Sequence, residues 1–180
     1  MHKTITNPVI KDEVTFVQTS VATKGRITTL QVKLMPGGGT PMHYHKNFSE
    51  AFIIIEGVLT ITLKDKTIRL APGEKLVVEK EQWHRFSNES TLPVIFTTIV
   101  TPGSEGFENA LRILYGLAGD QKTNKKGMPD NPLVLASISK ISDMWPAGPR
   151  ILIVPLLELM NFLAVLTGLK RKLLKKYCSQ

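Results

Sequence analysis

Residues 37–57, GGGTPMHYHKNFSEAFIIIEG, decide the fold of this chain. Residues two apart on an extended strand project to the same face, so His43 and His45 present both imidazoles on one side. Glu50 has the opposite parity, and the chain must turn at residues 46–49 before its carboxylate can join the two histidines. The stretch therefore predicts a strand, a turn and a second strand that bring these three side chains together.

The sequence around this stretch reads as short strands separated by Gly- and Pro-rich turns. The expected strands cover residues 14–16, 27–35, 51–55, 59–63, 68–70, 76–78, 84–88 and 93–101. Most of them alternate apolar and polar residues, the pattern of a half-buried strand. Residues 51–55 are continuously apolar, which predicts a strand covered on both faces. Regular short strands of this kind indicate a β sandwich or barrel.

The pattern changes after Pro102-Gly103. Residues 107–117 have the apolar spacing of an amphipathic helix, and residues 133–144 and 151–169 are expected to form two more. We therefore expect a β-barrel domain at residues 1–102 and a helical extension at residues 103–180. The fold class is mainly β, with the α-helical segment at its C-terminal end.

Three of the four histidines fall inside the predicted β domain. His84 lies 34 residues beyond Glu50, across the next hairpins. With His43 and His45 it completes a set of three imidazoles and one carboxylate, which suits a divalent transition metal and leaves positions open for water or substrate.

These residues match two motifs of a known family. The first motif is Gly37, His43, His45, Glu50 and Gly57 at the family's spacing, and the second is Gly73, His84 and Asn88. Over residues 25–102 the sequence resembles a single-domain cupin, which implies a jelly-roll β barrel with a metal bound in its mouth. The resemblance assigns the metal to His43, His45, Glu50 and His84. Residues 117–133 also look like an extension that some bacterial cupin proteins carry.

The second motif departs from the family pattern at two positions. Glu79 and Glu81 stand where the family has Pro and Gly. We therefore expect a differently shaped turn before His84, with two carboxylates near the mouth of the site.

The ligand set and the resemblance favour a metal-dependent enzyme that acts on a small organic molecule. Fe, Mn or Ni would support dioxygenase-like chemistry, and a non-redox ion such as Zn would support isomerisation or hydrolysis. Glu50 is the candidate catalytic residue, because the resemblance to dioxygenase-like cupins implies that this carboxylate can exchange protons while loosely bound to the metal. Phe52, Phe86 and Phe96 either line the substrate pocket or belong to the core. The alternative is a non-catalytic cupin that binds or senses a metal or small molecule, docked at a membrane surface through its C-terminal helix.

The net charge of +8 is concentrated near the C-terminus. Residues 151–169 are strongly apolar, and Lys170, Arg171, Lys172, Lys175 and Lys176 follow them. A helix here can pack on the barrel, pair with a second subunit in a homodimer, lie in a membrane interface or cross a bilayer. The sequence leaves these alternatives open.

Other function classes are disfavoured. The one cysteine, Cys178, excludes a disulfide framework. The basic tail lacks interleaved aromatic residues, so no nucleic-acid partner is expected. The first eight residues contain no apolar signal region, which makes the cytoplasm the expected compartment, with membrane association as an open alternative.

Overall fold

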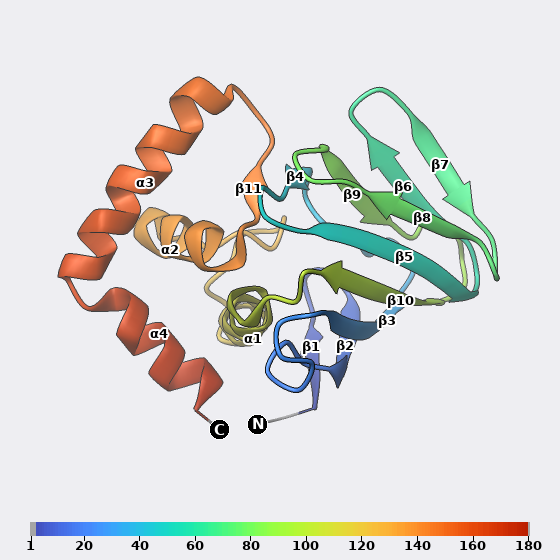
Figure 1. Ribbon diagram of the computed structural model, residues 1–180, viewed down its shortest axis with the longest axis horizontal. Helices are drawn as coiled ribbons and strands as arrows, with labels where there is room; N and C mark the ends of the chain where they lie inside the picture. Colours follow the sequence, from blue (N-terminus) through green and yellow to red (C-terminus); the bar gives the residue numbers. More distant parts are fainter. Residues whose placement is uncertain (1–2, 180) are drawn as a thin grey trace.

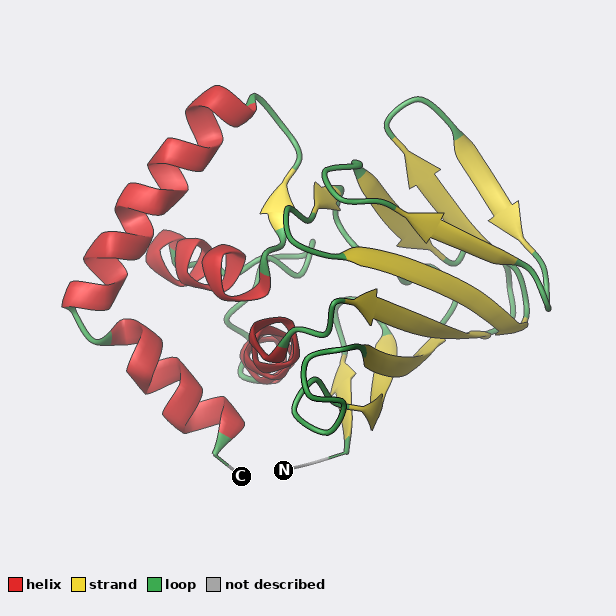
Figure 2. Cartoon of the chain, in the orientation of Figure 1, coloured by secondary structure: helices red, strands yellow, loops and turns green. Residues whose placement is uncertain are grey.

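The structure is a computed structural model that describes residues 3–179, so His2 lies outside the described part. Within it the chain forms strands β1–β10 and then helices, with the short strand β11 between α2 and α3, and Figure 2 shows the helices gathered to one side of the strands. The strands are β1 (Thr4–Asn7), β2 (Asp12–Gln18), β3 (Thr28–Leu34), β4 (His43–Tyr44), β5 (Ser49–Glu56), β6 (Leu59–Leu63), β7 (Thr67–Leu70), β8 (Lys75–Val78), β9 (His84–Ser87), β10 (Val94–Thr101) and β11 (Trp145–Pro146). The helices are α1 (Glu105–Gly119), α2 (Pro132–Ser142), α3 (Arg150–Leu166) and α4 (Leu169–Cys178).

The strands make two antiparallel sheets (Figure 1). The first has the order β1-β2-β3-β10-β5-β8 and the second β11-β4-β9-β6-β7. Leu34, Phe52 and Phe96 from the first sheet and Leu59 and Ile61 from the second belong to one buried cluster. The predicted mainly β barrel with a helical C-terminal extension is confirmed.

The central strand β5 corrects one expectation. Phe52 and Ile54 are buried on the inner face, but Ile55 on the outer face is 49% exposed. The outer side of β5 is therefore only half covered. The helices lie near the start of this strand, at the side of the barrel away from β6 and β7 (Figure 1).

The helical extension continues the barrel core. Ser104 caps α1 by accepting a hydrogen bond from the Phe107 amide, and Asn131 caps α2 in the same way. Phe107, Leu111 and Leu114 of α1 lie in the same buried cluster as the barrel residues. The extension also adds β11 to the second sheet, where Trp145 pairs with Tyr44.

The apolar segment at residues 151–169 is not one straight helix. The first helix, α3, ends at Leu166. Gly168 has a left-handed backbone with φ of 68°, and the basic run beyond it forms a separate helix, α4. No single helix among residues 3–179 has both the length and the apolar composition to cross a bilayer. α3 and α4 meet these criteria together, but they are bent by 79° at their junction.

Candidate metal centre

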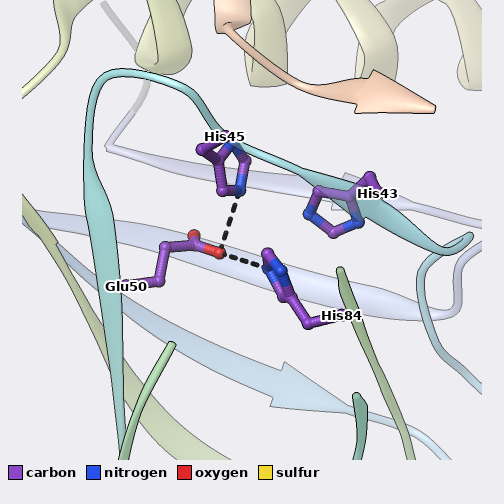
Figure 3. Close-up of side chains that lie close together, drawn as sticks. All are labelled: His43, His45, Glu50 and His84. Carbon is purple, nitrogen blue, oxygen red and sulfur yellow. Dashed lines mark hydrogen bonds and ion pairs between the residues drawn. The ribbon is translucent and has the colours of Figure 1, made fainter. Parts of the chain in front are cut away.

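Three neighbouring segments bring the four predicted ligands together (Figure 3). His43 in β4 lies directly opposite His84 in β9, and Glu50 begins the long strand β5. His45 follows β4 and shares its inward side with His43, whereas Tyr44 between them packs outward against the helices. All four side chains are buried, and one potential ligand atom from each lies within 4.8 Å of the others.

Backbone carbonyl groups fix the protonation pattern of all three imidazoles. The Nδ1 atoms of His43, His45 and His84 lie 2.8, 3.0 and 3.0 Å from the carbonyl oxygens of Pro41, Asp143 and Gln82. A carbonyl oxygen only accepts hydrogen bonds, so each Nδ1 carries the proton and donates it. In the neutral ring, the Nε2 atom is then left with a free lone pair.

Two of these lone pairs face one carboxylate oxygen. Oε2 of Glu50 lies 3.1 Å from Nε2 of His45 and 3.0 Å from Nε2 of His84, the two dashed lines in Figure 3. A neutral imidazole with its proton on Nδ1 has no hydrogen to donate to this oxygen. Buried acceptors that face each other need a positive charge between them, and a divalent cation satisfies the imidazoles and the carboxylate together. The donor set therefore fits a metal ion.

Electrostatics keep these groups in the forms that bind a metal. Burial lowers the pKa of His43 well below its usual value, and the neighbouring imidazoles of His84 and His45 lower it further. Burial by itself raises the pKa of Glu50, but positive charge and hydrogen bonding from the positions of His45 and His84 outweigh it and hold the pKa below its usual value, as a cation between the same groups would. A neutral His43 and an ionised Glu50 are the states that a divalent cation requires.

The comparison with family models agrees with this geometry. Residues 30–100 match the model described as a cupin domain. This part of the chain is a cupin domain. The matched region begins in β3, ends in β10 and contains all four candidate ligands.

Solved structures resemble the cupin domain at low sequence identity. KdgF from Halomonas sp. is 16% identical with a TM-score of 0.46, and the match covers 51% of this chain and 81% of that protein. A predicted oxalate decarboxylase from Thermotoga maritima is 17% identical with a TM-score of 0.49, covering 51% and 80%. The polyketide cyclase RemF from Streptomyces resistomycificus is 19% identical with a TM-score of 0.47, covering 51% and 65%. No curated protein matches the chain.

The turn before His84 differs from what the motif departure suggests. Glu81 adopts a left-handed backbone with φ of 63°, a conformation that favours glycine, so the turn has a glycine-like backbone despite the glutamate. Its amide donates to the carbonyl oxygen of His45 at 2.6 Å. The Glu81 carboxylate points to the surface, where it pairs with Arg150 at 3.2 Å.

The three predicted substrate-contacting rings lie in the interior of the cupin domain. Phe52 and Phe96 are buried with their ring centres 6.1 Å apart, and Phe86 lies 5.3 Å from Phe96. Phe52 also lies 6.3 Å from the His84 ring. This geometry gives them a packing role beneath the site, and their contact with a substrate stays a prediction.

Sequence reasoning missed Asp143, which lies 98 residues beyond His45 in the helical extension. Its backbone oxygen accepts the Nδ1 proton of His45. Its carboxylate accepts the amide protons of Lys46 and Asn47 at 2.8 and 2.6 Å and the Trp145 indole proton at 2.8 Å. The extension therefore orients one of the candidate ligands. In the sequence Asp143 is marked only as a polar residue at the end of a predicted helix, and this position does not reveal that it contacts His45.

Asp143→Ala removes the carboxylate that holds residues 46–47 and Trp145 in place, but keeps the backbone oxygen that accepts the His45 proton. Metal affinity is therefore expected to fall by about tenfold, the lower end of what partners that support a metal ligand contribute. Asp143→Asn keeps one acceptor oxygen and tolerates the left-handed backbone, with φ of 58°, so a smaller loss is expected. Competition with a fluorescent chelator measures both values. Asp130→Ala is the control, since this exposed aspartate lies on the same extension. Unchanged affinity in Asp143→Ala would show that the Asp143 carboxylate does not help to position His45.

An apolar cavity of about 80 Å³ adjoins the site. His43 and Met42 form its barrel side, and the extension closes the opposite side with Leu114, Leu135 and Ile138. The cavity is small, so it suits a small molecule or one end of a larger one. The helical extension thus supplies much of the surface that a ligand beside His43 would contact.

Proposed function

We propose that this protein is a metal-dependent enzyme that acts on a small, largely apolar organic molecule. The convergence of three imidazole lone pairs and a carboxylate beside an apolar cavity is the observation that carries the proposal. A metal that only stabilised the fold would not require an apolar cavity lined by one of its ligands.

His43, His45, Glu50 and His84 would hold the ion, and Fe, Mn, Ni or Zn suit this set of donors. When bound, the ion supplies Lewis-acid polarisation, and Fe or Mn adds redox chemistry with dioxygen. The reaction classes that follow are isomerase-like and dioxygenase-like.

Glu50 is the candidate proton carrier. The neighbouring imidazoles keep its carboxylate ionised but also make it a weak base, so it would accept a proton only from a molecule that a bound metal ion has made more acidic. The imidazoles of His45 and His84 hold it from two sides and fix its position. Asp143 supports this arrangement by orienting His45.

The Leu135→Trp variant tests whether the cavity leads to the metal. Leu135 is half-buried at the cavity wall, so a larger ring there is expected to fill the space and leave the fold intact. Isobutyrate, a small carboxylate with an apolar body, is the probe, and the visible spectrum of the Co(II)-loaded protein reports its binding. Leu135→Trp is expected to reduce isobutyrate affinity about tenfold or more while Co(II) content stays unchanged.

Leu92→Trp is the matched control, because Leu92 is 70% exposed and does not line the cavity. Equal isobutyrate affinity in both variants would contradict entry through this cavity. A Co(II) spectrum that no added carboxylate changes would contradict an open coordination position and, with it, the proposed enzyme.

A further inference from the structure

The outward side of α3 is apolar over about half of its circumference. It exposes Ile151, Leu152, Leu156, Leu159, Phe162, Leu163, Val165 and Leu166, with exposed fractions between 45% and 84%. A helix on the surface of a water-soluble protein normally turns polar residues outward. Contiguous exposed apolar residues of this extent indicate an interaction surface.

The inner side of α3 is already occupied. Leu157 and Ala164 are buried, and Ile153, Val154 and Met160 pack against the cluster around Trp145. Residues 151–169 contain one charged residue, Glu158, at the edge of the apolar side. Lys140 of α2 neutralises it at 2.7 Å. The apolar side is therefore not interrupted by an unpaired charge.

α4 places positive charge beside this apolar surface. Lys170, Arg171 and Lys175 line one surface hollow of about 820 Å³ together with Val165 and Leu166 from the end of α3. Glu105 at the start of α1 also borders this hollow. Beyond Glu158 the sequence contains no acidic residue. We call the outward residues of α3 and these three cations the apolar-basic face.

We propose that the apolar-basic face docks the protein onto the surface of an anionic lipid bilayer. Apolar side chains of α3 would enter the boundary between headgroups and acyl chains, while Lys170, Arg171 and Lys175 contact lipid phosphates. This proposal is independent of the chemistry at the metal centre.

Geometry and charge favour this occupant over the alternatives. α3 has 17 residues and is about 25 Å long, which is shorter than a bilayer core of about 30 Å. The 79° bend before α4 prevents the two helices from forming one straight span. A second copy of the chain would bring another basic run to the same surface, whereas an anionic membrane supplies the opposite charge. Figure 1 shows α3 and α4 along the edge of the molecule away from β6 and β7, so the barrel does not obstruct a flat surface there.

Vesicle flotation with the full chain tests the proposal. The vesicles contain phosphatidylcholine alone or with about a third phosphatidylserine, at low and at high ionic strength. Binding is expected only with phosphatidylserine and is expected to weaken as salt is added. Lys170→Glu/Arg171→Glu/Lys175→Glu is expected to lower the partition coefficient by more than about tenfold, since each basic residue near an anionic surface contributes about fivefold.

The matched control reverses the charge of two lysines and one arginine on the opposite side of the molecule. Lys64, Lys66 and Arg69 are exposed on the β6–β7 hairpin, and their replacement by Glu is expected to leave binding within about twofold of the wild type. Leu156→Glu/Leu163→Glu changes only exposed residues of α3 and is expected to abolish binding without unfolding the protein. Light scattering gives the oligomeric state of each variant.

Equal loss of binding in both charge variants would show a nonspecific charge effect and overturn the proposal. Failure of the wild-type protein to bind anionic vesicles at low salt would also overturn the proposal. If the wild type instead forms a dimer, and Leu156→Glu/Leu163→Glu dissociates that dimer, a second copy of the chain covers the apolar side of α3. Metal content, measured on the same samples, reports separately on the proposed function.

Discussion

The His43→Ala/His45→Ala variant is expected to lose its metal, whereas the wild-type protein is expected to bind close to one transition-metal ion per chain. The double change removes two of the four ligands and leaves Glu50 with His84 alone. We expect affinity to fall at least about 100-fold, because one carboxylate and one imidazole no longer supply the four-ligand set that would hold the ion. Mass spectrometry of the metal in purified protein measures the content directly.

His2→Ala provides the control, since it removes the one histidine outside the predicted ligand set. Circular dichroism identifies a variant that has merely unfolded, and chelation of the wild-type protein gives a second readout. Chelation is expected to lower its melting temperature, because metal binding stabilises the folded state by mass action. A metal-free wild type whose stability is unchanged by added Fe, Mn, Ni or Zn would exclude the metal centre.

The stability of the protein is expected to fall as pH rises from about 4 to about 7 because of Asp12. Burial raises the pKa of this carboxyl from 3.8 to about 7, although the Tyr115 hydroxyl donates a hydrogen bond to it at 2.5 Å and opposes the rise. The folded state therefore binds the proton more tightly than the unfolded state. The favourable contribution is complete below about pH 4 and is lost as pH rises to about 7.

Asp12→Asn cannot ionise, so the difference in unfolding free energy between this variant and the wild type isolates the effect. The difference is expected to change by on the order of 4 kcal/mol between pH 4 and pH 8, in favour of the variant at high pH. Urea unfolding at a series of pH values measures it. Asp65→Asn, in the exposed β6–β7 turn, serves as the control. A constant difference across this range would disprove the assignment to Asp12.

Local sequence patterns predict most of the barrel and the gathering of the candidate ligands. Strand parity places His43 and His45 on one face, and the turn at residues 46–49 allows Glu50 to join them, as the structure shows. These features depend on neighbours within a few residues. The role of the four residues as metal ligands stays a prediction that the variants above address.

Features that depend on distant packing were missed. Asp143 acts through hydrogen bonds to residues 45–47, almost a hundred positions earlier, and its local sequence does not reveal that contact. The exposure of Ile55 depends on where the helices lie, and the bend between α3 and α4 depends on the left-handed backbone of Gly168. In each case the pattern of apolar and polar residues within the segment does not determine the interaction or the backbone conformation.

The pairing of β11 with β4 has a consequence for biosynthesis. His43 and His45 leave the ribosome early, but the strand that borders His43 and the carbonyl group that orients His45 are contributed by residues 143–146. During translation the surroundings of the candidate ligands are therefore complete only after about a hundred further residues have been synthesised. A metal ion held by these residues in the native geometry would therefore be captured only after residues 143–146 have been synthesised.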